Sequence, residues 1–145
     1  ELDAAHSANG ISLQRTYLDA ETEAPASSYT VGQFVVIRLE AQTETPCYDV
    51  VIEDALPAGF RPVMGSLKVE GLEHSGLEVS EHGDTVRFYL TELPTGVHTF
   101  TYLQRAETPG RFLATPAVAY MLYHPARWGQ SAGQEITVEQ RELSE

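Results

Sequence analysis

Positive charge is scarce in this sequence, since only nine of its 145 residues are lysine or arginine and Lys68 is the single lysine. Against them stand 21 aspartates and glutamates, so the formal net charge is −12. Phosphate backbones and anionic lipid surfaces both repel a chain this acidic. We therefore expect no nucleic acid partner. No apolar run approaches the ~20 residues that a membrane helix needs, so we expect no direct membrane insertion.

Cysteine is almost absent as well. Cys47 is the single cysteine, which excludes an intramolecular disulfide and a metal site built from several thiolates. It follows Pro46 and has no cationic neighbour in the sequence that would activate its thiol. We expect Cys47 to fill space in the core as a small apolar residue rather than to act as a nucleophile.

Catalytic signatures are missing too, because the sequence contains no G-x-S-x-G, P-loop, H-E-x-x-H or G-x-G-x-x-G motif. Two pairs, Glu73-His74 and Glu81-His82, lie eight residues apart, and a hairpin between them would bring them together. Metal ligation needs three or four such groups in a fixed geometry, so we interpret the pairs as solvated turns. The sequence predicts a protein that is not an enzyme, with no catalytic residues, no cofactor and no metal ion.

Helical periodicity is also missing, whereas short alternating segments fill the chain. Strands are expected at residues 11–18, 34–43, 48–55, 85–91, 98–105, 112–123 and 135–140, with a break at Pro116 and a loop over 124–133. Residues 67–72 and 77–80 carry weaker strand patterns around a glycine-rich connection. Proline and glycine mark turns at 56–60, 93–96 and 108–110. The pattern predicts an all-β fold, an antiparallel β-sandwich of seven or eight strands of immunoglobulin or fibronectin III type.

The sandwich is expected to occupy residues 10–140, between a flexible N-terminal segment, 1–9, and a flexible C-terminal tail, 141–145. Because the chain begins at Glu1, without a methionine or a signal-peptide pattern, we expect either a processed chain or a piece of a longer protein. Strand 34–43 should be central, and Ile11, Leu13 and Tyr17 should share one face. The side chains expected to be largely buried are Val35, Ile37, Leu39, Phe88, Phe100 and Val118.

One segment, residues 120–129 (YMLYHPARWG), concentrates large aromatic and apolar side chains in and beside the expected loop. Tyrosine and tryptophan combine a wide apolar face with a polar tip, which suits contact with another protein surface. The same residues would equally suit a cap that folds back over the end of the sandwich. The composition leaves both interpretations open.

These residues also carry a resemblance to a known family. LPTGVHTFTYLQRAETPGRF at 93–112, PAVAYMLYHPARWGQSAG at 116–133 and a final ITV strand resemble the C-terminal macroglobulin domain of bacterial α2-macroglobulins. Upstream, YTVGQFVVIRLEAQT and YDVVIEDALPAGFRPV match the same domain. The resemblance covers residues 10–140 and implies an immunoglobulin-like macroglobulin domain.

The resemblance implies a role in protein contacts rather than a reaction. Family members are periplasmic endopeptidase inhibitors of bacterial defence, attached to the inner membrane by an N-terminal lipid anchor, that trap attacking proteases. In many members a thioester from a C-x-E-Q motif in a separate domain captures the protease. Cys47 is followed by Tyr48-Asp49-Val50, so this chain forms no thioester of its own. Its implied partners are neighbouring domains of the parent, above all the thioester-type domain, and the protease through the parent.

In thioester-bearing members, a tyrosine-bearing loop of this domain shields the reactive bond. The matching segment here implies Tyr123 as the main shielding residue, Met121 as the second, and His124, Pro125 and Trp128 beside them. Tyr123 is then expected to be at least partly exposed when its partner surface is missing. The alternative function is an independent cell-surface adhesion or ligand-binding β-sandwich module from a repeat array.

Overall fold

The computed structural model describes residues 7–69, 72, 76–82 and 84–140. Within this part of the chain every regular element is a strand. The fourteen strands are β1 Ser7–Asn9, β2 Ser12–Asp19, β3 Ser28–Thr30, β4 Phe34–Thr43, β5 Cys47–Ala55, β6 Phe60–Pro62, β7 Lys68–Val69, β8 Glu78–His82, β9 Thr85–Leu93, β10 Gly96–Ala106, β11 Gly110–Ala114, β12 Val118–Met121, β13 His124–Gln130 and β14 Gln134–Glu139.

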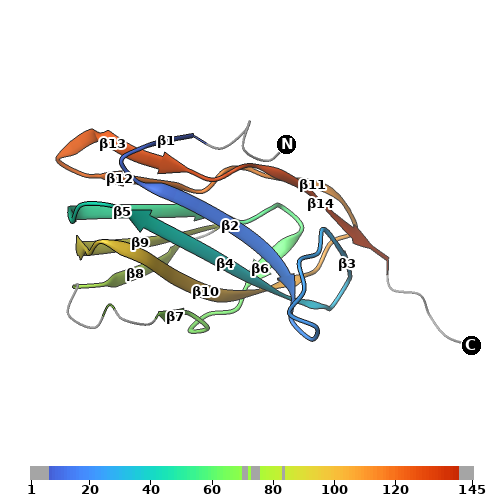
Figure 1. The fold of residues 1–145 in the computed structure, drawn as a ribbon. Helices are drawn as coiled ribbons and strands as arrows, with labels where there is room; N and C mark the ends of the chain where they lie inside the picture. The colour runs from blue at the N-terminus through green and yellow to red at the C-terminus, as the bar shows by residue number, and fades with distance from the viewer. Residues whose placement is uncertain (1–6, 70–71, 73–75, 83, 141–145) are drawn as a thin grey trace, which may run out of the picture.

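The strands form two main layers and a small third sheet. A six-stranded sheet has the order β1-β13-β12-β5-β9-β8, and a five-stranded sheet has the order β2-β4-β10-β6, with β7 also paired to β10. The third sheet, β11-β14-β3, lies at the end of the molecule opposite the tip of the β12–β13 hairpin (Figure 1). Pairing is antiparallel in both main sheets, and β14 and β3 are parallel.

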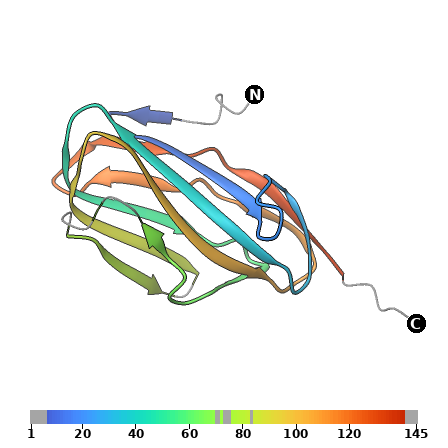
Figure 2. The ribbon, with the colours of Figure 1, turned by 60° about the horizontal axis from the view of Figure 1, so that its bottom comes forward.

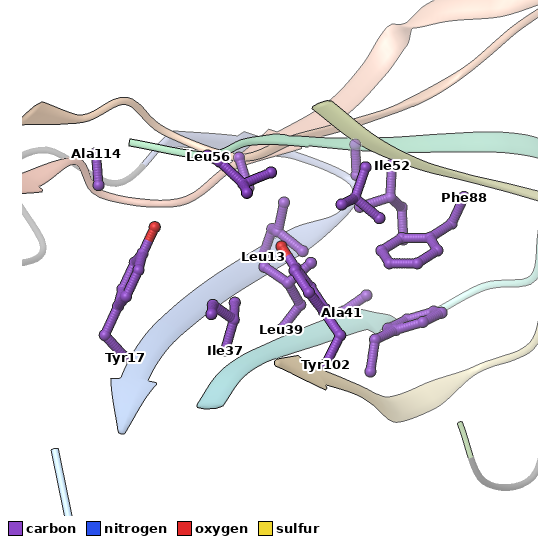
Figure 3. Packing of buried hydrophobic residues seen from close by; sticks show 14 of the residues in the cluster. Leu13, Tyr17, Ile37, Leu39, Ala41, Ile52, Leu56, Phe88, Tyr102 and Ala114 are labelled. Carbon is purple, nitrogen blue, oxygen red and sulfur yellow. The ribbon is translucent and has the colours of Figure 1, made fainter. Parts of the chain in front are cut away.

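The core lies between the two main sheets because their strands alternate apolar and polar side chains. Along β4 every second residue is buried, and β4 is an inner strand between β2 and β10. The rings of Phe88 on β9 and Phe100 on β10 stack across the interface with centroids 5.2 Å apart. Figure 3 shows the side chains of the two layers meeting in this space, with Phe88 and Ile52 facing Ala41 and Tyr102. Cys47 is fully buried, and its sulfur lies 3.4 Å from Thr43 Oγ1.

A buried ion pair crosses the core. The guanidinium of Arg15 on β2 donates to Asp54 on β5 at 2.6 Å, and both side chains are fully buried. Arg15 also donates to the carbonyl of Ala114 at 3.1 Å, and the Tyr102 hydroxyl donates to the second Asp54 oxygen. Burial raises the pKa of the Asp54 carboxyl, while Arg15 and Tyr102 oppose that rise. This network connects all three sheets.

One long hairpin is divided between two sheets. Strands β11 and β14 continue the register of β12 and β13, but the pairing stops between Ala114 and Val118. Pro116 lies in this gap and has no backbone N–H to donate to a ladder. Across the gap, Ser131 and Ala117 still bond, from Ser131 N to Ala117 O and from Ala117 N to Ser131 Oγ, each at 2.9 Å. The break lets the hairpin leave the six-stranded sheet and start the third sheet.

The expected fold class is confirmed, but the expected number of strands was too low. The breaks at Pro116 and around Ser131 turn one hairpin into four strands, and short strands such as β1, β3 and β6 carry too few residues for a visible alternation. The prediction of a loop at 124–133 was wrong, because residues 124–130 form β13, which pairs between β1 and β12. Of the ends expected to be flexible, residues 1–6 and 141–145 lie outside the described residues, and residues 7–9 form β1.

The expected buried residues are confirmed with one exception. Five of these side chains are fully buried, namely Val35, Ile37, Leu39, Phe88 and Phe100. Ile11, Leu13 and Tyr17 are also buried, and each is at most 1% exposed. Val118 is only half-buried. Its neighbours Ala117 and Ala119 point into the core, so strand alternation turns Val118 to the outer face.

Phe100 gives the first test of this packing. Replacing it in Phe100→Ala should lower the free energy of unfolding by about 3–5 kcal/mol, because a buried ring stacked on Phe88 leaves a cavity. Thr99→Val, on the outer face of the same strand, should change it by less than about 0.5 kcal/mol. Urea unfolding followed by circular dichroism measures both. A loss below about 1 kcal/mol for Phe100→Ala contradicts its place in the core.

The ion pair gives the second test. Asp54→Ala should cost about 3–5 kcal/mol, because it leaves the Arg15 guanidinium buried without its counter-charge. The double variant Arg15→Met/Asp54→Leu removes both charges and should recover most of that loss. Urea unfolding of the three proteins measures the coupling. A double variant as unstable as Asp54→Ala means that the unpaired charge is not what destabilises the single variant.

Candidate functional site

The most exposed aromatic side chain in the described chain lies at the tip of the β12–β13 hairpin. Leu122 and Tyr123, here called the hairpin tip, join the two strands, and Met121 pairs with His124 across the turn. The Tyr123 side chain is 71% exposed and that of Leu122 is 43% exposed. Met121 points the other way and is buried. The tip is therefore held at its base by the core and presents its own side chains outward.

Asp49 on β5 anchors the hairpin tip. Its carbonyl oxygen accepts a hydrogen bond from the Leu122 backbone N–H at 2.7 Å. Its backbone φ is 53°, in the left-handed region that aspartate tolerates better than most residues. Its carboxylate accepts a hydrogen bond from the Tyr89 hydroxyl at 2.5 Å. Asp49 therefore bonds the tip through its backbone and the neighbouring strand β9 through its side chain.

The Tyr89 hydroxyl acts only as a donor in this arrangement. Its hydrogen bond to Asp49, followed by desolvation and by the negative charge of Asp49, raises the pKa of Tyr89 to about 12. Tyr123 is close enough to add to the same shift. Tyr89 therefore keeps its proton at neutral pH, and the bond from Tyr89 to Asp49 persists across the physiological range.

A row of large side chains continues from the hairpin tip across the six-stranded sheet. Trp128 on β13 pairs with Tyr120 on β12, Tyr120 pairs with Val51 on β5, and Val51 pairs with Tyr89 on β9. Residues paired across strands share a face of the sheet. Their chain neighbours Ala119, Ile52 and Phe88 point into the core, so the row lies on the outer face of the sheet. Val51 is only 5% exposed there, and Trp128, Tyr120 and Tyr89 are half-buried. We call Trp128, Tyr120, Val51 and Tyr89 the aromatic row.

An ion pair borders the aromatic row. The Arg87 guanidinium bonds Glu53 through Nε at 2.8 Å and also through a terminal nitrogen. The Tyr120 hydroxyl lies 3.5 Å from the same carboxylate oxygen. The pair is solvent-exposed, so its contribution to stability is small. It places a charged rim beside an apolar row, which is the usual anatomy of a protein–protein contact surface.

The structure brings together some of the residues expected from the sequence and separates others. Tyr123 is at the tip, with His124 and Pro125 exposed beside it at the start of β13. Trp128 is half-buried in the aromatic row, four residues further along β13. Met121 is buried and so does not contribute to the exposed surface. Leu122 lies in the expected contact segment 120–129 but was not named as a shielding residue. Asp49 and Tyr89 were not predicted as site residues.

Alternation places Tyr89 on an outer face, which is a usable signal for this residue in sequence. No sequence signal marks the φ of Asp49.

A polar cleft of about 640 Å³ lies at the same end of the molecule as the hairpin tip. It is lined by Gly10, Ser12, Gln42, Thr43, Glu44, Thr45 and Arg127. Arg127 donates there to Gly10 O at 3.3 Å and to Thr45 Oγ1 at 3.1 Å, so it links the segments around Gly10 and Thr45.

The site offers contact surface rather than reactive chemistry. Among the described residues, no three His, Cys, Asp or Glu side chains converge in a way that would hold a metal ion. Glu73 and His74, from the two Glu-His pairs, lie outside the described residues, and Glu81 is half-buried on β8. In the part of the chain that the structure describes, no helix is long and apolar enough to cross a membrane.

Comparison with known proteins identifies a matching family, a curated bacterial relative and similar solved structures. The family model described as the bacterial alpha-2-macroglobulin MG10 domain matches residues 10–126. An alpha-2-macroglobulin homolog from Nostoc is 30% identical over 120 residues, which are 77% of this chain and 6% of the relative. This chain thus spans about one seventeenth of that relative's length.

Solved structures agree on the fold. A tyrosine-to-glycine mutant of Salmonella alpha-2-macroglobulin superposes with a TM-score of 0.81 at 18% identity, over 92% of this chain and 9% of that one. The Salmonella protein reacted with methylamine gives a TM-score of 0.74 at 20% identity, over 92% of this chain and 9% of that one. The family match covers most of the chain and the fold agrees with it, so this chain belongs to the bacterial alpha-2-macroglobulin MG10 domain family, whose members are non-catalytic.

Proposed function

We propose that this chain is the C-terminal domain of a periplasmic protease-trapping protein and that its hairpin tip docks on the neighbouring thioester-type domain. The observation that carries the proposal is the exposure of Tyr123 on an anchored tip. A tyrosine that is 71% exposed contributes little to the stability of its own domain. The same ring gains a large buried area once a second surface covers it.

The anchoring supports a docking role because it reduces the entropic cost of binding. A flexible loop loses conformational freedom when it docks, and this loss weakens the contact. Here the Leu122 N–H is already bonded to Asp49, and Met121 is already buried at the base of the hairpin. The tip therefore has its orientation before any partner arrives, and most of the contact energy remains available for binding.

Shielding follows from what a tyrosine ring does when it is pressed against a reactive bond. An acyl thioester survives in water only where water and amines are excluded. The ring of Tyr123 supplies a wide apolar cover, and Leu122 lies next to it. In this proposal Tyr123 covers the bond, Leu122 extends the cover, and His124 and Pro125 line its edge.

The aromatic row widens the proposed contact beyond the tip. Trp128, Tyr120 and Tyr89 lie on one outer face, next to the Glu53–Arg87 pair. Half-buried tyrosine and tryptophan side chains inside a charged rim are the composition found at the centre of protein interfaces. The neighbouring domain would then rest on the six-stranded sheet while the tip reaches its thioester.

The partners and location of the whole protein belong to the same proposal. A protease would be met by the parent chain rather than by this domain. The parent would act in the periplasm, attached to the inner membrane by a lipid anchor at its N-terminus.

The shielding role predicts the behaviour of Tyr123→Ala. In the 145-residue chain, the substitution should change the free energy of unfolding by less than about 1 kcal/mol, because the residue lies outside the core. In a thioester-bearing parent, it should speed the loss of the thioester to methylamine before any protease is added. Free-thiol release measures that loss. Leu113→Ala is the matched control, because Leu113 is 68% exposed on the third sheet, away from the tip. Equal methylamine rates for Tyr123→Ala and the unaltered parent contradict the shielding role.

The backbone conformation of Asp49, which bonds the hairpin tip, predicts a difference between two substitutions of this residue. Asp49→Gly fits a φ of 53° without a side-chain penalty, whereas Asp49→Ala does not, so the glycine variant should be the more stable by about 1 kcal/mol. Urea unfolding of the 145-residue chain measures the difference. Both variants lose the bond from Tyr89, as does Tyr89→Phe, so hydrogen exchange at the Leu122 amide should be faster in all three. Unchanged exchange in Tyr89→Phe means that the carboxylate does not hold the tip.

A further inference from the structure

The outer face of the five-stranded sheet collects basic residues in a chain that has few of them. Four of the nine lie on its strands, namely Arg38 on β4, Arg61 on β6, Lys68 on β7 and Arg105 on β10. Thr101 on β10 pairs with both Arg38 and Lys68, and Arg105 pairs with Arg61. Paired residues share a face, and the neighbouring Phe100 and Tyr102 of β10 point into the core. These four side chains, here called the basic face, therefore all point outward.

Among the described residues, few carboxylates offset the basic face. Glu107, just after β10, lies 3.0 Å from Arg61 Nε and 3.8 Å from Arg105. Glu40 is half-buried on the outer side of β4. Asp19, at the end of β2, accepts backbone hydrogen bonds within its own turn. Among the described residues, neither Arg38 nor Lys68 forms an ion pair.

The contrast with the rest of the molecule is large. Counted over the described residues, the four basic side chains against Glu40 and Glu107 give the basic face a net charge of +2. The remainder of the sequence then holds five basic and nineteen acidic residues, a net charge of −14. An acidic neighbour is repelled by most of this chain and attracted only by the basic face, and such asymmetry fixes the orientation of a contact.

The basic face also has an apolar centre. Val36 on β4 and Leu103 on β10 pair across the strands and are half-buried. Next to them, the Phe34 ring is 47% exposed, and the Arg105 guanidinium lies 6.0 Å from its centroid. An apolar centre with arginines around it suits a protein surface better than it suits a small ion. Strands β4 and β10 cross the front of the molecule in Figure 2.

We propose that the basic face docks an acidic surface of another domain of the same parent chain. The six-stranded sheet, which carries the hairpin tip, is the opposite layer of the sandwich. The domain would then hold two neighbours at once, one on each layer. This inference needs the chain to be part of a larger protein, but it does not depend on the shielding role of Tyr123.

Thiol labelling at the centre of the basic face tests the contact. Thr101→Cys places a thiol between Arg38 and Lys68, and the native Cys47 is buried. The full-length parent is treated with N-ethylmaleimide, and labelling of the Thr101 peptide is followed by mass spectrometry. Labelling should be slower in the parent than in the 145-residue chain by about ten-fold or more, because the docked domain covers the thiol. Equal rates in the two proteins overturn the proposal.

Charge reversal tests whether electrostatics hold the contact. Adding Arg38→Glu and Lys68→Glu to the Thr101→Cys parent should raise the labelling rate towards that of the 145-residue chain. Cations beside a thiol favour the reactive thiolate, so reversal without undocking would slow labelling instead. Salt at about 1 M, where the Debye length is about 3 Å, should act like the reversal. Arg111→Glu, at an exposed arginine of the third sheet, is the matched control and should leave the rate unchanged.

Two further outcomes separate this contact from its alternatives. Tyr123→Ala should leave protection at Thr101 intact, so that failure of the shielding role and failure of this proposal are told apart. The 145-residue chain should not sediment with phosphatidylglycerol vesicles, because its net charge is −12. Sedimentation that Arg38→Glu/Lys68→Glu abolishes would assign the basic face to a lipid surface and overturn the proposal.

Discussion

The buried ion pair between Arg15 and Asp54 determines how the layers of the sandwich pack on each other. Neither charge is stable in an apolar core without the other, so strands β2 and β5 are fixed in one register across the sandwich. Tyr102 on β10 donates a hydrogen bond to the second carboxylate oxygen of Asp54. Arg15 also donates to the carbonyl of Ala114, where the long hairpin turns towards the third sheet. A slip of one residue in either strand would leave one charge without its buried partner. The pair therefore specifies the packing of the layers.

The register of β5 carries this constraint to the surface. Asp54 lies inward towards one end of β5, and Asp49 lies five residues earlier, where it bonds the hairpin tip. The position of Tyr123 is therefore set by the core through a single strand. The aromatic row depends on the same register, because Val51 joins Tyr120 and Tyr89 across the sheet. A rigid scaffold thus presents an exposed tip and an outward-facing row as one surface.

Strand alternation predicted much of the fold but only part of the site. The period of two along 34–43 placed Val35, Ile37 and Leu39 in the core. The same period puts Arg15 on the face of Leu13 and Tyr17, and Asp54 on the face of Ile52, yet a single sequence does not say which strands oppose each other. The φ of Asp49 has no signature in sequence. Residues 124–130 were mistaken for a loop because proline and glycine interrupt their alternation, while pairing on both sides makes them a strand.

We propose that the anchored, exposed Tyr123 is covered by a neighbouring domain of the parent. A cryo-electron microscopy structure of the intact parent in its uncleaved state tests this most directly. We expect the Tyr123 ring, 71% exposed in this chain, to be buried there against the thioester-type domain, with Asp49 still bonded to the Leu122 N–H. A Tyr123 ring that remains in solvent in the uncleaved parent would contradict it.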